Sequence, residues 1–251
     1  MNSLGLLALG IMQGIFEWLP VSSEGQLFLL GSFIGMGAHE SLRIALFLHL
    51  GTSLAAFIYY RREYLRALMG GEDLQFLVVG TLSSFITAAP IALFLEEVVS
   101  SYEEVLSMSV GFLLIAVGLL LRRAESSLKV RDKPGLKDAV ITGLAQGVAL
   151  MPGVSRSAMT ISALMLRGFD LRSSFRYSFM LGGIATLLAG LSKAGDPASW
   201  WVIVPTTLTG FLALGLLDKI SNRVRMSTFS IGFGLLSLAL ACIKILGGFY
   251  S

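Results

Sequence analysis

The chain has 251 residues, of which 55% are hydrophobic and only 14% are charged, and its formal net charge is +3. A soluble protein of this length needs more charged side chains to cover its surface, so an ordinary soluble domain is excluded. The mean hydropathy of +0.78 and apolar runs near the roughly 20 residues that cross a bilayer indicate an all-α integral membrane protein. The Lys and Arg residues fall in loops, where they orient membrane helices, so we expect no nucleic-acid partner.

In chain order, one broken apolar segment precedes three continuous ones, and the same series then recurs. The broken segments are residues 4–36, interrupted by Glu17 and Pro20, and residues 136–166, interrupted by Pro152 and Arg156. A helix cannot run straight through these breaks without losing backbone hydrogen bonds, and such backbone is tolerated at membrane depth only where protein or water surrounds it. We therefore expect each broken segment to be a pair of half-helices, or a re-entrant hairpin, with a polar motif at its turn. Six full transmembrane helices are predicted: residues 42–60, 74–95, 106–121, 174–192, 200–217 and 228–246.

Loop charge predicts the orientation of these helices. The loops 61–73, 122–137 and 218–226 carry three, six and three Lys or Arg residues, whereas 96–104 carries four Glu and none. The positive-inside rule places the first three loops in the cytoplasm and the acidic loop outside. This predicts a multi-pass protein of the cytoplasmic (inner) membrane with both termini outside. The first broken segment then begins and ends outside, and the second inside.

The two halves of the chain are related by an internal repeat. At an offset of 133 residues, five positions of the first broken segment match the second: Gly10, Gln13, Gly14, Val21 and Ser22 fall on Gly143, Gln146, Gly147, Val154 and Ser155. Three spans follow each broken segment, and because three is odd the second half must be inverted. We predict a first repeat over 1–121, a cytoplasmic linker over 122–136 and an inverted repeat over 137–251 in one membrane domain. In this design the two broken segments meet near the midplane and form the site.

The first polar motif covers residues 13–26. Gln13 and Glu17 are four residues apart and share one face of a helix. A carboxylate inside the bilayer costs about 3 kcal/mol on insertion scales, so Glu17 needs a charged or hydrated partner. We expect Gln13 and Glu17 beside a divalent cation, or Glu17 as a base, with Ser22 or Ser23 as a candidate nucleophile.

The second polar motif covers residues 151–160 and supplies a partner for Glu17 in Arg156. A guanidinium is a planar fork that matches phosphate oxygens. Hydroxyls surround it at Ser155, Ser157 and Thr160, and a half-helix N-terminus there would favour anions. One carboxylate, one guanidinium and several hydroxyls together predict a site for a phosphate ester or a diphosphate.

The two motifs, Gln-x-x-x-Glu-x-x-Pro-Val-Ser-Ser-x-Gly and Pro-Gly-x-Ser-Arg-Ser-x-x-Thr, resemble those of the undecaprenyl-pyrophosphate phosphatase family, also called the bacitracin-resistance family. The resemblance covers essentially the whole chain. It implies a membrane enzyme that removes the terminal phosphate of a long-chain polyprenyl diphosphate and yields the monophosphate carrier of cell-envelope glycan synthesis. It further implies a divalent cation, Mg²⁺ or alternatively Ca²⁺, and is compatible with a homodimer. The implied roles are catalytic for Glu17, Ser22, Ser23 and Arg156, substrate-binding for Ser155, Arg156, Ser157, Thr160 and Gln26, and metal-binding for Gln13 and Glu17.

One departure from the family pattern affects the predicted chemistry. Gln26 stands where the family usually has His, and a glutamine amide neither takes nor gives a proton at neutral pH. Glu24 adds a second carboxylate beside the motif and is a candidate to compensate. For His49, inside an apolar span, a structural or cavity-facing role is favoured over that of a replacement catalyst.

Several alternatives remain open from the residues alone. Glu17 and Arg156 could form a structural ion pair that joins the repeats, and the serines could cap half-helices or bond between helices. Trp18 is expected at the interface or against lipid. The alternative function is a lipid-phosphate transporter or flippase at the same anion site, favoured by the inverted repeat and the missing His. A non-catalytic lipid-phosphate binder is the third reading.

Overall fold

The predicted all-α class is confirmed. The computed structural model describes residues 3–33, 35–101, 103–126, 131, 133–192, 197–220 and 225–246, and no β-strand occurs among them. The helices are α1 (Ser3–Phe16), α2 (Ser23–Phe33), α3 (Ala38–Tyr59), α4 (Arg61–Leu68), α5 (Glu72–Ser101), α6 (Glu103–Glu125), α7 (Leu136–Val148), α8 (Arg156–Leu166), α9 (Leu171–Ser192), the 3₁₀ helix η1 (Pro197–Val202), α10 (Ile203–Ile220) and α11 (Met226–Leu246).

Membrane-spanning character is clearest in five of the described helices. Helices α3, α5, α6 and α11, and α10 with the end of η1, are long and apolar enough to cross a bilayer. The predicted span 174–192 lies in α9, which is equally long at 22 residues but has Arg172 and Arg176 in its first half. Large apolar side chains on the outward faces are exposed, for example Leu93, Leu212 and Leu246. A bilayer would cover these faces.

Each broken segment forms two helices separated by a turn, as predicted. Between α1 and α2 the chain turns through Pro20 and Ser22, which has a φ of 56°. Between α7 and α8 it turns through Pro152 and Gly153, whose φ of 93° is a conformation that glycine adopts without strain. Ser155 then caps α8, because its hydroxyl accepts the Ala158 N–H at 3.3 Å.

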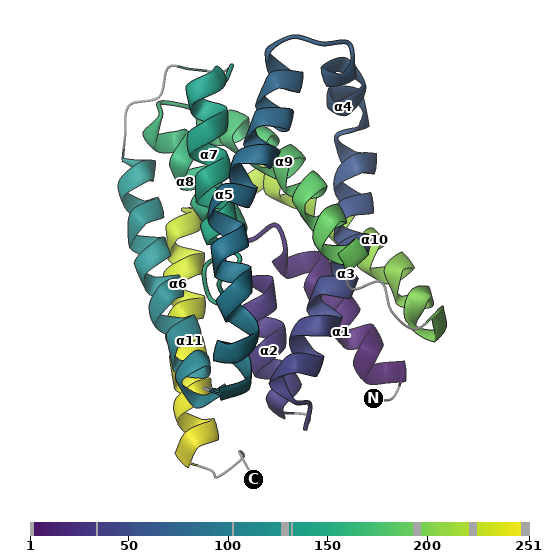
Figure 1. Cartoon of the computed structure of the whole chain (residues 1–251), viewed down its shortest axis with the longest axis vertical. Coiled ribbons are helices and arrows are strands. Elements are labelled where there is room, and N and C mark those ends of the chain that lie inside the picture. Colours follow the sequence, from purple (N-terminus) through teal and green to yellow (C-terminus); the bar gives the residue numbers. More distant parts are fainter. Residues whose placement is uncertain are drawn as a thin grey trace.

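The two helix pairs lie toward opposite ends of the molecule. Figure 1 shows α1 and α2 in the lower part and α7 and α8 in the upper part. Each first half-helix packs on a span of the other half of the chain, α1 on α10 and α7 on α5. Glycines permit this close approach: Gly14 faces the backbone of Thr206 and Gly210, and Gly147 faces that of Ser84. Helix α3 also packs on α9, and α6 on α11, so the halves are interleaved.

The acidic segment 96–104 differs from the expected loop. Helix α5 continues to Ser101 and α6 begins at Glu103, so most of this segment is helical. Glutamate is a good helix former, and nothing in the segment breaks a helix as proline or glycine does. The expectation that these residues form a loop is therefore wrong.

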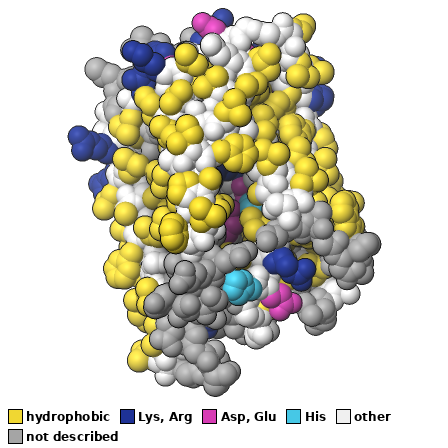
Figure 2. All heavy atoms as spheres, viewed as in Figure 1, with side chains coloured by type: hydrophobic (Ala, Val, Ile, Leu, Met, Phe, Trp, Pro, Cys, Tyr) yellow, Lys and Arg dark blue, Asp and Glu magenta, His cyan; other side chains and the backbone are white. Residues whose placement is uncertain are grey.

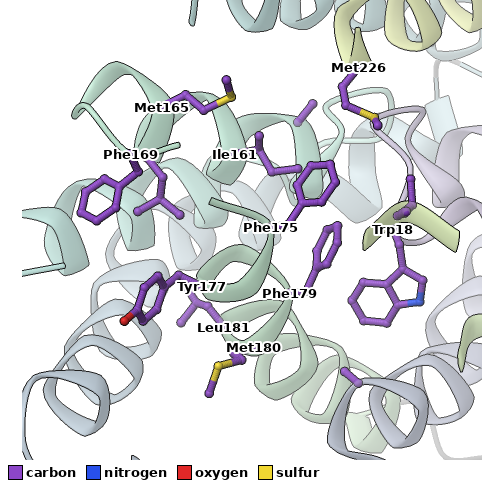
Figure 3. Close-up of a cluster of buried hydrophobic side chains, with 14 of the residues drawn as sticks. Trp18, Ile161, Met165, Phe169, Phe175, Tyr177, Phe179, Met180, Leu181 and Met226 are labelled. Carbon is purple, nitrogen blue, oxygen red and sulfur yellow. The ribbon is translucent and has the colours of Figure 1, made fainter. Parts of the chain in front are cut away.

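The main apolar core joins the first motif to the second half of the chain. In Figure 3 the Trp18 indole lies beside the ring of Phe179, which stacks on the ring of Phe175. The Trp18 and Phe179 ring centroids are 5.3 Å apart in an edge-to-face arrangement, and Trp18 is only 1% exposed. The expectation that Trp18 faces lipid or the interface is therefore wrong. Buried here, the indole fixes the turn after α1 against α9.

Candidate functional site

An ion pair between the two motifs forms the centre of the site. Arg156 Nη2 lies 2.6 Å from Glu17 Oε1, and the two side chains are 10% and 3% exposed. Glu17 follows the last residue of α1, and Arg156 is the first residue of α8. The turns of the two broken segments therefore meet inside the protein. A buried charge needs a partner of opposite sign, and Glu17 and Arg156 are that partner for each other.

The Arg156 guanidinium is held on three further sides. Its Nη1 donates to the Ser178 carbonyl at 3.4 Å, and its Cζ lies 5.4 Å from the centre of the Trp18 ring. A cation over an indole face is attracted by the ring. Gly182 on α9 leaves the space that the guanidinium fills, since a Cβ at this glycine would overlap it. The fork is therefore fixed in orientation.

The second oxygen of Glu17 accepts a cluster of donors. Gln13 Nε2 donates to Oε2 at 2.8 Å and the Ser23 hydroxyl donates to it at 2.7 Å. His49 Nε2 lies 3.1 Å from the same oxygen. Gln13, Ser23 and His49 are all buried. The Glu17 carboxylate is thus immobilised between Arg156 and these three polar side chains.

Sequence reasoning did not assign His49 to this site. His49, on α3, lies 3.2 Å from Glu24 Oε1 as well as next to Glu17, so it bridges two carboxylates. Among the described residues, Glu17, Glu24 and His49 form a group whose ligand atoms lie within 4.8 Å of one another and could hold a metal ion. The sequence did contain a signal for His49: an ionisable residue inside an apolar span by default indicates a functional site.

The remaining hydroxyls of the two motifs are buried and engaged in hydrogen bonds. The Ser22 hydroxyl accepts the N–H groups of Gly153 at 3.1 Å and Gly25 at 3.4 Å. Ser157 donates to the Leu19 carbonyl at 2.8 Å. Bonds to neighbouring groups also engage the hydroxyls of Ser155 and Thr160. Ser22 and Ser157 therefore tie the two turns together across the halves of the chain.

Gln26 lies apart from the ionic cluster. Its amide donates to the Ser237 hydroxyl on α11 at 2.9 Å and to the Val21 carbonyl at 3.1 Å. Glu24 and Gln26 are two positions apart on α2, and so point about 200° from each other around the helix. Glu24 lines the cavity described below and Gln26 does not.

A cavity of about 330 Å³ extends from the ionic cluster. Four charged or titratable side chains line it: Glu17, Glu24, His49 and Arg156. The rest of its wall is mainly small or apolar and comes from α3, α5, α7 with the two residues after it, and α9. In Figure 2 acidic and histidine side chains are visible at the bottom of a hollow whose rim is apolar. The polar end is thus reached through a surface that suits lipid rather than water.

A divalent cation fits the side chains at this polar end. Carboxylate and imidazole groups are ordinary metal ligands, and Glu17, Glu24 and His49 offer three. Gln13 contributes a further buried oxygen, because its Oε1 has no hydrogen-bond partner among the described residues. Of the two predicted ligands, Glu17 belongs to the group of three, and Gln13 lies next to it.

Comparison with known proteins places the chain in a family. Residues 6–243 match the family model of the bacitracin resistance protein BacA. Proteins named undecaprenyl-diphosphatase are similar along most of their length. The protein from Methanothrix thermoacetophila is 36% identical over 97% of this chain and 98% of its own. The protein from Haloarcula marismortui is 39% identical, over 87% and 89% of the two chains. The chain therefore belongs to the BacA bacitracin-resistance family.

Proposed function

We propose that this protein is a membrane phosphatase that removes the terminal phosphate of a long-chain polyprenyl diphosphate, such as undecaprenyl diphosphate, and leaves the lipid monophosphate. The observation that carries the proposal is the cavity, with Arg156 and Glu17 at one end, apolar walls along its length and an apolar rim. A diphosphate attached to an isoprenoid chain matches both ends of such a cavity. The name of the relatives, undecaprenyl-diphosphatase, supports the same substrate class.

Arg156 would bind the terminal phosphate. Its guanidinium lines the cavity, and Glu17 and the Ser178 carbonyl engage only some of its five N–H donors. Charge that builds up on the phosphate oxygens in the transition state would be stabilised by a donor that is already oriented. The N-terminus of α8, where Arg156 lies, adds a positive dipole end at the same place.

Ser23 is the better placed of the two candidate nucleophiles. Its hydroxyl donates to the Glu17 carboxylate at 2.7 Å, so Glu17 can take the proton. Attack of the Ser23 oxygen on the terminal phosphorus breaks the phosphoanhydride bond, releases the lipid monophosphate and leaves a phosphoserine. Water then hydrolyses the phosphoserine, which releases phosphate and restores the hydroxyl. The Ser22 hydroxyl, by contrast, accepts two backbone N–H groups and is assigned a structural role.

A divalent cation would assist by neutralising the diphosphate. The expectation of Mg²⁺ or Ca²⁺ rests on the oxygen donors of Gln13 and Glu17. Without an ion, Glu17, Glu24 and Arg156 sum to one negative charge when His49 is neutral, and this would repel a diphosphate. With a divalent ion the same group carries one positive charge and would attract it.

The proposed topology is an inverted repeat in the cytoplasmic membrane, with both termini on the outer side of that membrane. Support comes from reciprocal packing, since α1 of the first half packs on α10 while α7 of the second half packs on α5. The location of the two helix pairs toward opposite ends of the molecule is consistent with this (Figure 1). Lys and Arg side chains gather in the upper half of the face drawn in Figure 2, and we assign this end to the cytoplasm.

The decisive experiment measures phosphate release beside lipid movement. Purified protein in micelles should release phosphate from a long-chain polyprenyl diphosphate, and EDTA should stop the release. We expect Arg156→Ala to lower turnover at least about 100-fold, with Arg66→Ala on α4, an exposed residue, as the matched control. Proteoliposomes report movement of the same lipid between leaflets. Lipid movement without phosphate release would refute the phosphatase and support the flippase alternative.

A further inference from the structure

His49, which lies outside both motifs, completes a polar cluster with Glu17 and Glu24 of the first motif. His49 comes from α3, Glu24 from α2 and Glu17 from the turn after α1, so the three meet only in the folded chain. His49 is 2% exposed, and its Nε2 lies 3.1 Å from Glu17 Oε2 and 3.2 Å from Glu24 Oε1. Its other ring nitrogen, Nδ1, has no hydrogen-bond partner among the described residues. Nε2 is therefore the nitrogen that faces the carboxylates.

These separations match the spacing of ligands around one ion. Two ligand atoms that each lie about 2.1 Å from a cation, at right angles to one another, are roughly 3 Å apart. The two measured separations from Nε2, 3.1 and 3.2 Å, are close to this value. Without an ion, a proton on Nε2 must join the imidazole to the carboxylates. A cation can replace that proton with little movement of the three side chains.

Neighbouring side chains hold the two carboxylates in place. The Ser23 hydroxyl lies 2.7 Å from Glu17 Oε2 and 3.4 Å from Glu24 Oε2, so it can donate to either. Gln13 Nε2 also donates to Glu17, at 2.8 Å. Hydrogen bonds to ligating carboxylates are the usual second layer of a metal site, because they fix the orientation of the ligands.

We propose that Glu17, Glu24 and His49 together bind the divalent ion of the proposed reaction, with His49 Nε2 as a nitrogen ligand. An imidazole ligand favours first-row transition ions, whereas Mg²⁺ and Ca²⁺ prefer oxygen ligands alone. This ligand set departs from the expectation of Mg²⁺ or Ca²⁺, which rested on oxygen donors alone. Mn²⁺, a first-row ion that also takes carboxylate oxygens, should bind more tightly than either. The proposal rests on the proposed function for its purpose, but the binding of the ion is measurable without substrate.

The test uses Mn²⁺ alone and the purified full chain. Electron paramagnetic resonance counts free Mn²⁺ in a titration, and electron spin echo modulation reports nitrogen bonded to the bound ion. The chain has only two histidines, and His39 is exposed in the first turn of α3, which makes His39→Ala the matched control. We expect nitrogen modulation in the wild type and in His39→Ala, and its loss in His49→Gln together with an at least tenfold rise in the Mn²⁺ dissociation constant. Mg²⁺ should displace Mn²⁺ only at about tenfold higher concentration or more.

The outcomes separate this inference from the proposed function. Bound Mn²⁺ without nitrogen modulation in the wild type overturns the ligand set, and this result needs no variant to fold. Nitrogen modulation that disappears in His39→Ala would also overturn the ligand set. Phosphate release with no detectable Mn²⁺ binding would overturn it as well. Nitrogen-coordinated Mn²⁺ in a protein that releases no phosphate counts against the proposed function alone.

Discussion

Replacing Gly182 by alanine should move the Arg156 guanidinium without unfolding the protein. A Cβ on Gly182 would overlap Arg156 Nη1 and Cζ and lie 2.9 Å from Nη2. Non-bonded carbon and nitrogen atoms touch at about 3.5 Å, so the guanidinium has to shift by more than roughly 1 Å. The obstructed atoms are the end of a flexible side chain, which can turn away. The bond of 2.6 Å to Glu17 is then lost or distorted.

The expected loss of activity follows from this displacement. Misplacing a positioned group by about 1 Å costs on the order of 100-fold in rate, which corresponds to roughly 2.7 kcal/mol of transition-state stabilisation. We therefore expect Gly182→Ala to lower kcat/KM for polyprenyl diphosphate about 100-fold, measured as phosphate release in micelles. Thermal unfolding should change by only a few degrees, because Glu17 keeps its bonds from Gln13 and Ser23.

The neighbouring glycine gives the matched control. A Cβ on Gly183 would also be crowded, but by the Tyr64 hydroxyl at 2.6 Å and the Ala56 Cβ at 2.9 Å. Gly183→Ala should therefore lower stability as much as Gly182→Ala or more, while activity stays within about threefold of the wild type. Full activity in Gly182→Ala, or equal losses in the two variants, would refute the argument that Arg156 acts through its fixed position.

Four further predictions concern the first motif and the cavity. Gln26→His should not raise turnover, measured by phosphate release, because this side chain points toward α11 and away from the cavity; a clear rise would contradict this. Ser22→Ala should lower the free energy of unfolding by about 1–2 kcal/mol, since two buried N–H groups lose their acceptor. Ser23→Ala should instead abolish the acid-stable phosphoprotein that the wild type forms with substrate labelled in its terminal phosphate; label retained in Ser23→Ala would exclude Ser23 as nucleophile. Ala89 lines the apolar part of the cavity, so Ala89→Phe narrows the cavity there. It should raise KM for a long-chain substrate roughly tenfold and leave KM for a short-chain substrate unchanged; equal effects on both would place the lipid chain elsewhere.

The helix breaks and the ion pair were predictable because their causes are local. Proline removes a helical hydrogen bond, and at Pro20 and Pro152 it coincides with a polar motif, so the turns there follow from the sequence. Pro90, by contrast, stands in an apolar run and lies inside α5. A carboxylate within an apolar segment needs a partner, and Arg156 is the one cation of the second motif. The pairing of Glu17 with Arg156 thus follows from the cost of burying charge.

The assignment of His49 was not predictable in the same way. Its contacts to Glu17 and Glu24 depend on how α3 packs beside α1 and α2, and no spacing along the chain encodes that packing. The direction of Gln26, in contrast, could have been found. It lies two residues after Glu24 on one helix, so the two side chains cannot face the same cavity.

Comparison of the two motifs position by position separates structure from chemistry. Most of the positions at which the halves are identical form the framework: Ser22 and Ser155 each accept the N–H three residues later, and Gly14 and Gly147 each admit a helix of the other half. The identical pair Gln13 and Gln146 is the exception, because Gln13 donates to Glu17 and Gln146 lines the cavity. At the same offset of 133 residues, the charged positions have no counterpart. Glu17 falls on Leu150, Ser23 on Arg156 and Glu24 on Ser157.

This asymmetry explains how one framework supports a polar site. Two copies of the same turn, brought together from opposite ends, would face each other with like side chains. Acidic groups on the first copy and a guanidinium on the second instead give a carboxylate side and a cationic side, across which Glu17 and Arg156 pair. A diphosphate and a divalent ion need opposite charges next to each other, and only divergence of the two turns can supply them. The positions that break the repeat are therefore those at which substitution should affect turnover more than folding.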